Sequence, residues 1–122
     1  MTTTIAIVGS RRRTDRASII RLVAYLQTTY GYMEIISGGC RGPDTWAIEA
    51  AERARIPTHI YRPNFPQQGA PYHAIVEACY ARNQQVAEAC DILFAFVAPD
   101  RRGGTEDTIR RATRLNKRVV IL

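Results

Sequence analysis

Three short stretches of the sequence place glycines where a chain can bind an anion. They are Gly9-Ser10-Arg11, then Ser37-Gly38-Gly39 with Asp44 shortly after it, and Gly103-Gly104-Thr105. Glycine has no side chain, so the backbone N–H groups of such turns can come close to a bound molecule. A helix that begins at the turn adds partial positive charge at the same place. These residue types and their spacing predict a binding site for phosphate or another anion.

Short apolar runs precede these stretches and recur along the rest of the chain. They occupy Ile5 to Val8, Tyr32 to Ser37, Thr58 to Tyr61, Ile92 to Val97 and Val119 to Leu122. Such runs are typical of strands that are buried on both faces, and we expect the last one to be buried as well. A proline-rich stretch, residues 64–72, predicts a long loop that forms a lid or rim.

The segments between the apolar runs carry apolar residues at helical spacing. The second predicted helix begins near Pro43, which suits a first helical position. The third begins at about His73, and we expect a break near Arg82-Asn83. In the fourth, Thr105 is the predicted N-cap and Leu115 ends the apolar stripe.

Strands that alternate with helices predict a parallel sheet covered on both faces. We therefore expect one α/β domain over residues 1–122, with a Rossmann-like three-layer fold and a five-stranded parallel sheet in the order 3-2-1-4-5. Ligands of such sheets bind at the carboxyl ends of strands 1 and 4, where the connections diverge. Two of the glycine stretches follow these strands and the third lies beside them, so all three are expected at one rim.

The charge of the chain favours an anionic partner. Its formal net charge is +6, from 17 basic and 11 acidic residues, and Lys117 is the one lysine among the basic residues. Guanidinium groups bind phosphate through two hydrogen bonds, as a nucleotide or a nucleic acid would require. A GC-rich coding sequence explains many arginines equally well, so only arginines at loop mouths, such as Arg11, bear on the site.

Several well-known sites are absent from the sequence. No Gly-x-Gly-x-x-Gly follows the first strand, no P-loop motif occurs, and no Gly-x-Ser-x-Gly is present. Cys40, Cys79 and Cys90 are widely spaced and lack the pairing of a zinc or redox motif. We therefore expect free thiols, no metal and no cofactor.

The sequence also bears on the compartment. No run of about 18 apolar residues is present to span a membrane, and residues 1–5 lack the features of a signal peptide. We expect a cytoplasmic protein with no membrane partner.

A further set of residues carries a resemblance to a known family. The three glycine stretches, with Gly42-Pro43-Asp44, Ala81-Arg82-Asn83 and Asp91, follow one another in the order and spacing of the SLOG superfamily. That superfamily includes DprA, the Lonely Guy enzymes and the YspA/YpsA-like proteins, and the chain resembles the short YspA/YpsA-like type over nearly its whole length.

The resemblance implies a Rossmann-like domain that binds a nucleotide or a nucleotide-derived ligand, often as a dimer or higher homo-oligomer, and that in several branches acts as a sensor. By the matching positions, Gly9, Ser10 and Arg11 would hold a phosphate or sugar. Ser37, Gly38, Gly39 and Asp44 would line the second loop, Arg82 and Asn83 would reach in from the long helix, and Gly103, Gly104 and Thr105 would cradle a phosphate.

One departure bears on catalysis. The Lonely Guy motif Pro-Gly-Gly-x-Gly-Thr-x-x-Glu carries an acid at its end, whereas this chain has Thr108 three residues after Thr105. Without a carboxylate there, nothing is assigned to stabilise an oxocarbenium-like sugar. Glu106 or Asp107 would substitute only if the helix were rotated. No catalytic residue is therefore assigned.

The residues leave several roles open. Asp44 either binds a ribose hydroxyl or complements the start of its helix. Arg82-Asn83 either belongs to the site or forms a helix cap with surface charge, and Cys40 is either activated by its turn or an inert small residue. Nucleotide binding and sensing rank first, nucleoside-monophosphate phosphoribohydrolase activity second, and DprA-like nucleic-acid binding third.

Overall fold

The computed structural model describes residues 2–122, so Met1, the first residue of the predicted domain, lies outside the described residues. Its elements in chain order are β1 (Thr3–Gly9), α1 (Arg16–Thr29), β2 (Met33–Ser37), α2 (Pro43–Arg53), β3 (Thr58–Ile60), α3 (Tyr72–Ala89), β4 (Ile92–Phe96), α4 (Gly104–Arg114) and β5 (Arg118–Ile121). The strands form one parallel sheet in the order β3-β2-β1-β4-β5. The predicted fold class and strand order are confirmed.

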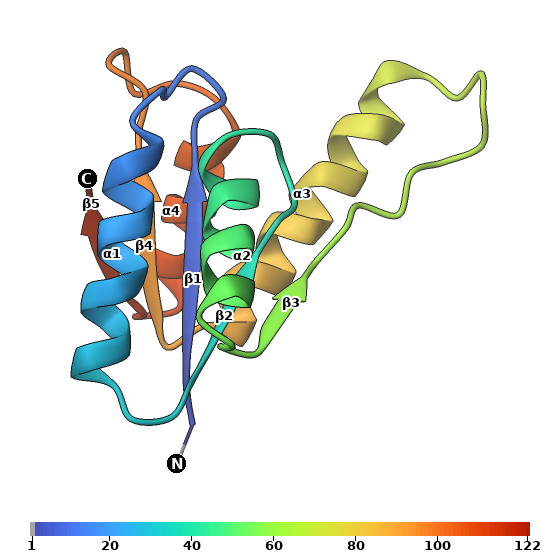
Figure 1. The fold of residues 1–122 in the computed structure, drawn as a ribbon. Coiled ribbons are helices and arrows are strands. Elements are labelled where there is room, and N and C mark those ends of the chain that lie inside the picture. The colour runs from blue at the N-terminus through green and yellow to red at the C-terminus, as the bar shows by residue number, and fades with distance from the viewer. Residues whose placement is uncertain (1) are drawn as a thin grey trace.

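Helices cover both faces of the sheet, so the core has two layers. Figure 1 shows α1 and α2 over one face and α4 with the end of α3 over the other. Ile5 and Ile7 of β1 pack with residues of α1 and α2, whereas Ala6 and Val8 pack with residues of α3 and α4. Because successive strand residues point to opposite faces, β1 must be apolar throughout, as its sequence is.

The carboxyl ends of the strands bring three loops to one rim. β1 pairs with β2 on one side and with β4 on the other, and Gly9 lies opposite Phe96 in this register. The N–H of Ser10 continues the ladder by donating to the carbonyl of Phe96 at 2.9 Å. The loops that follow β1, β2 and β4 therefore start side by side, as the strand order requires.

The third helix differs from its prediction. α3 is continuous from Tyr72 to Ala89, so the expected break near Arg82-Asn83 is wrong. Both side chains are buried against neighbouring elements instead of capping a helix end. A polar pair inside a helical sequence therefore indicated a buried contact, not a helix end.

The end of the chain also differs from its prediction. Gly103, with φ of 111°, is the N-cap of α4, and Thr105 lies inside the helix. Leu115 lies just after the helix and is exposed, so it does not extend the apolar stripe. β5 pairs only with β4 at the edge of the sheet, as the predicted order requires, but its residues are half-buried or exposed, so the expected burial of this strand is wrong.

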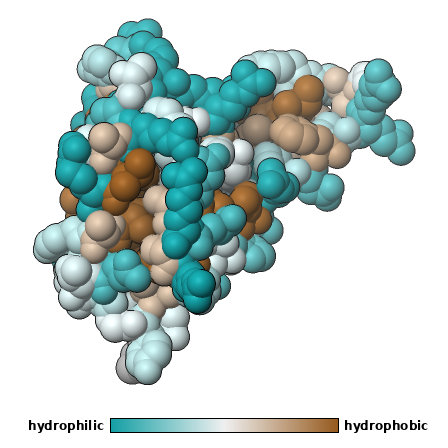
Figure 2. Space-filling model, in the orientation of Figure 1, coloured by the Kyte–Doolittle hydropathy of each residue, from teal (hydrophilic) through white to brown (hydrophobic). Residues whose placement is uncertain are grey.

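The first half of α3 and the loop before it project from the body of the molecule (Figure 1). We call residues 63–80 the arm. Phe65, Tyr72, Ile75 and Tyr80 of the arm are exposed, and Figure 2 shows hydrophobic side chains on its surface. Among residues 2–122, no helix is both long and apolar enough to cross a bilayer.

Candidate functional site

A cavity of about 360 Å³ lies at the carboxyl ends of β1, β2 and β4. Its size is in the range of small-molecule sites, which is roughly 300–1,000 Å³. Residues of all three glycine stretches line it, together with residues of α3. Of the residues predicted for the site, all except Ser37 and Gly39 are in this lining.

Asp44, in the first turn of α2, joins two of the glycine stretches. One carboxylate oxygen accepts the N–H of Gly9 at 3.0 Å, and the other accepts the N–H of Gly38 at 3.0 Å. The side chain is only 3% exposed. Burial raises the pKa of Asp44 from 3.8 to about 6, while these two N–H groups and the charge of Arg82 oppose the shift. Asp44 thus holds the ends of β1 and β2 together.

Ser37 and Gly39 shape the turn behind the cavity wall. The buried Ser37 hydroxyl accepts the N–H of Gly39 at 3.1 Å. Gly39 has φ of 74°, and a Cβ there would lie 2.7 Å from the Ile60 side chain. Both residues therefore act on the shape of the turn, and the structure does not bring them into the cavity lining.

Arg82 of α3 is buried in the cavity wall, with 7% of its surface exposed. Its guanidinium donates to the carbonyl of Gly38, to Oδ1 of Asn83 at 2.9 Å and to Sγ of Cys40 at 3.5 Å. No carboxylate of residues 2–122 forms an ion pair with it. The charge of Asp44 acts on Arg82 only at longer range. A buried guanidinium that lacks a direct ion pair is costly, so this wall favours an anion. The reading of Arg82-Asn83 as surface residues is wrong.

Asp107 positions this arginine indirectly, and sequence reasoning missed it. The buried Asp107 carboxylate accepts Nδ2 of Asn83 at 3.0 Å and Nε of Arg111 at 2.7 Å. Asn83 thereby keeps its Oδ1 turned toward Arg82. In the sequence, Asp107 is only an acidic residue in the first turn of a helix, where acids are common, so no signal distinguished it.

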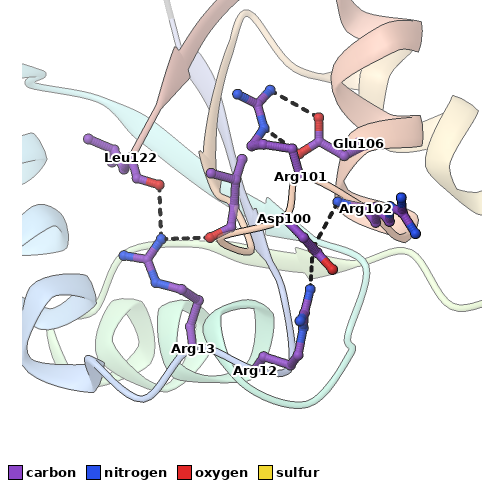
Figure 3. A network of polar contacts seen from close by, with 8 residues as sticks. Arg12, Arg13, Asp100, Arg101, Arg102, Glu106 and Leu122 are labelled. Carbon is purple, nitrogen blue, oxygen red and sulfur yellow. Dashed lines mark hydrogen bonds and ion pairs between the residues drawn. The ribbon is translucent and has the colours of Figure 1, made fainter.

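Most of the arginines around the rim are already paired, as Figure 3 shows. Arg12 pairs with Asp100, and Arg101 pairs with Glu106 at 2.8 Å. Arg13 donates to the carbonyls of Val97 and Leu122, and also pairs with its neighbour Asp15. These contacts fasten the loops after β1 and β4 to each other and to the end of the chain.

Arg11 and Arg102 are the exceptions at the cavity mouth. Both line the cavity and are exposed. Neither forms an ion pair with any residue from 2 to 122. With Arg82, they place around one cavity three guanidinium groups that form no direct ion pair with residues 2–122. Arg102 was not among the predicted site residues, although its place beside Gly103-Gly104-Thr105 was a signal for it.

The acids of α4 are not free to act in the cavity. Glu106 is paired with Arg101, and Asp107 is held by Asn83 and Arg111. Thr108 lines the cavity at the position where the Lonely Guy motif has its glutamate. Among the described residues of the lining, Asp44 is the one carboxylate, and both of its oxygens accept backbone N–H groups. Across residues 2–122, His, Cys, Asp and Glu form no cluster of three that could hold a metal ion.

The start of α4 opens onto the cavity without a side-chain cap. Gly103 and Gly104 line the cavity, and no side chain of residues 2–122 caps the first N–H groups of this helix. A Cβ built at either glycine would meet no atom within 4 Å. These N–H groups are therefore accessible to an anion, as helix N-termini in phosphate sites are.

Alanine at Gly104 is therefore expected to fit the free protein and to obstruct its ligand. We expect Gly104→Ala to lower the affinity for a phosphate-bearing ligand at least as much as Gly39→Ala does, while its melting temperature stays close to that of the parent. Gly39→Ala, with positive φ and a clash with Ile60, should lower the melting temperature. Thermal denaturation and calorimetric titration measure the two effects. A Gly104→Ala protein that is destabilised more than Gly39→Ala would contradict this assignment.

Comparison of the structure with solved structures finds the same fold elsewhere. DNA processing protein A (DprA) from Streptococcus pneumoniae superposes with a TM-score of 0.77 at 20% identity, over 98% of this chain and 50% of that protein. DprA from Helicobacter pylori, in a study of its single-stranded DNA binding mode, superposes with a TM-score of 0.74 at 22% identity, over 98% of this chain and 64% of that protein. The molybdenum cofactor carrier protein of Chlamydomonas reinhardtii superposes with a TM-score of 0.64 at 17% identity, over 98% of this chain and 76% of that protein.

The chain thus spans half of the first DprA structure and less than two thirds of the second. No protein-family model matches the sequence, and no curated protein matches it. The likeness therefore lies in the order of the strands and the path of the chain. The chain has the fold of DprA, and this is the fold of the SLOG superfamily that its glycine stretches predict.

Proposed function

We propose that this protein binds a nucleotide or a nucleotide-derived ligand in the cavity at the carboxyl ends of β1, β2 and β4. The observation that carries the proposal is the buried guanidinium of Arg82, which lines this cavity without a carboxylate partner among residues 2–122. The uncapped start of α4 lies in the same lining. Phosphate oxygens satisfy both kinds of donor.

The positions of the acidic residues around the cavity agree better with ligand binding than with catalytic turnover. Hydrolysis of an N-glycosidic bond needs a carboxylate beside the sugar, and the two acids of α4 are engaged in ion pairs outside the lining. We therefore propose a ligand-binding protein that acts as a sensor. Chromatography for free base, after incubation with nucleoside monophosphates, tests the enzymatic alternative, and release of base would favour it.

The test of nucleotide binding uses Arg11, which is exposed and has no ion-pair partner in the described part of the chain. We expect Arg11→Ala to weaken binding about tenfold, because a charge-assisted hydrogen bond contributes roughly 1.5–3 kcal/mol. Calorimetry with mono-, di- and cyclic nucleotides and ADP-ribose measures the affinities. Arg21→Ala removes the same charge from exposed α1, outside the cavity lining, and is the matched control. Absence of binding to every nucleotide of the panel would refute the proposal.

Nucleic acid is a second candidate, favoured by the fold of DprA and by the net charge of +6. The Helicobacter pylori DprA structure concerns single-stranded DNA binding. If this chain binds single strands through its free arginines, the affinity should fall steeply with salt. Titration of a labelled oligonucleotide at two salt concentrations, with mononucleotide as competitor, separates the two candidates. An oligonucleotide that mononucleotide does not displace would favour a nucleic-acid surface outside the cavity.

We further propose that the protein forms a homodimer or a higher homo-oligomer through the arm. A helix that is apolar on several sides is normally covered by another surface. Apart from His73, Glu77 is the one acidic or basic residue in 63–80. Pairing of two arms would therefore bring little charge together. We expect Ile75→Glu to lower the mass measured by light scattering, whereas Ile20→Glu, at an exposed position of α1, should not. We also propose a cytoplasmic location, in keeping with three free thiols.

A further inference from the structure

Two of the three cysteines lie in the wall of the candidate ligand cavity. Cys40, between β2 and α2, and Cys79, in α3, are both half-buried and line this cavity. Cys90, at the end of α3, is fully buried in the second core layer. Burial raises the pKa of the Cys90 thiol. Solvent therefore reaches two thiols through the cavity and does not reach the third.

The surroundings of Cys40 are electropositive. Its sulfur accepts a hydrogen bond from the Arg82 guanidinium at 3.5 Å. That guanidinium is buried and has no ion-pair partner among residues 2–122. Arg11 lines the same cavity as a second cation that forms no ion pair with residues 2–122. A sulfur that is partly exposed beside a positive charge is in the environment in which cysteines react.

We propose that Cys40 is a covalent modification site for small, negatively charged disulfides. The deprotonated sulfur of Cys40 attacks one sulfur of the reagent, the disulfide bond of the reagent breaks, and a new bond forms between Cys40 and that half. The other half leaves as a thiolate, and the proton that Cys40 released passes to the solvent, so atoms and electrons balance. The arginines of the cavity attract the anionic reagent and favour its approach.

The adduct has a direct consequence for the cavity. Because Cys40 lines the cavity and its sulfur lies 3.5 Å from Nη2 of Arg82, a group attached to this sulfur would lie beside that guanidinium. An anionic adduct would also supply the direct ion pair that Arg82 lacks among residues 2–122. This consequence, loss of ligand affinity in the modified protein, rests on the proposed function; the reactivity of Cys40 does not.

The experiment compares two disulfides of opposite charge on the whole chain. Dithiobis(nitrobenzoate) is a dianion and cystamine is a dication. The rate at which each reagent modifies the folded protein is divided by the rate at which the same reagent modifies the urea-unfolded protein. We expect Cys40 to react roughly tenfold faster with the dianion than with the dication, and high salt to reduce this preference. Peptide mass spectrometry locates the adduct. Cys40→Ser should remove the fast phase, Cys79→Ser should retain it, and Cys90 should stay unmodified.

Arg11→Ala, at an exposed position, should reduce the preference for the dianion without unfolding the protein. A fast phase that survives Cys40→Ser, or equal normalised rates for the two reagents, would overturn the inference. If no nucleotide binds while Cys40 still prefers the dianion, the proposed function fails and this inference stands. If nucleotides bind and Cys40 is inert, only this inference fails.

Discussion

Replacing Asp44 with alanine is expected to destabilise the protein by about 4 kcal/mol, because each buried N–H left without an acceptor costs roughly 1–3 kcal/mol. The two groups are the N–H of Gly9 and the N–H of Gly38, each 3.0 Å from a different oxygen of the carboxylate. The change also removes a negative charge beside the buried Arg82. Urea denaturation measures the free energy of unfolding.

Asp44→Asn is the informative companion to this variant. It keeps the size of the side chain, but its NH₂ group cannot accept a hydrogen bond, so one of the two N–H groups loses its acceptor. We expect a loss of stability smaller than that of Asp44→Ala. If Asp44→Ala unfolded at the same urea concentration as the parent, the link between β1 and β2 through this side chain would be disproved.

The stability of the parent relative to Asp44→Asn should depend on pH with a sign that is unusual for a carboxylate. Burial raises the pKa of Asp44 in the folded protein to about 6, above the 3.8 of the unfolded chain. Protonation therefore favours the folded state, and this contribution is complete below pH 3.8 and is lost as the pH rises through 6. The stability of the parent relative to Asp44→Asn should increase from pH 7 to pH 4. The other carboxylates are common to both proteins, so their effects cancel in this comparison. A stability of the parent relative to Asp44→Asn that decreases from pH 7 to pH 4 would contradict the assignment.

Gly9→Ala is expected to have the second large effect. It should lower the free energy of unfolding by about 3 kcal/mol, near the upper end of the losses found when cores are overpacked. A Cβ at this position would lie 2.5 Å from Cγ of Pro43 and 2.9 Å from Cβ of Phe96. Neither neighbour is a flexible side-chain end, because one belongs to a ring at the start of α2 and the other is fixed to the backbone of β4. The clash would push apart the turn that Asp44 fastens.

Gly31→Ala is the matched control for this variant. A Cβ at Gly31 would meet no atom within 4 Å, and its φ is not in the left-handed region. Thermal denaturation should show a large decrease in melting temperature for Gly9→Ala and almost none for Gly31→Ala. Equal melting temperatures would show that the close approach of β1 to Pro43 is not rigid.

The fold was predictable because its signals are local and repeated. Three of the strands, β1, β2 and β4, are short apolar runs that are largely buried, and a proline or glycine lies near the start of several elements that follow. The partial exposure of β5 was not predicted from its residues, because Val119 and Val120 are as apolar as those of a buried strand, although the predicted strand order already placed this strand at the edge of the sheet. Burial there depends on which strands flank it, and hydrophobicity alone does not show this.

The positions of the site were predictable, but the internal contacts that build it were not. The glycine stretches marked the loops, and the strand order brought them together. No pattern in the sequence linked Asp44 to two backbone N–H groups, or Asp107 through Asn83 to Arg82. These links join residues far apart in the chain, and they depend on side-chain directions that only the folded structure defines.

The link through Asp44 has a consequence for the thermodynamics of binding. A carboxylate that holds the loops after β1 and β2 to the first turn of α2 fixes them before a ligand arrives. A ligand that enters such a site does not have to order these loops, so little of its interaction energy is lost to chain entropy. Association should then follow a single fast phase whose rate rises linearly with ligand concentration, without a slow rearrangement after the encounter.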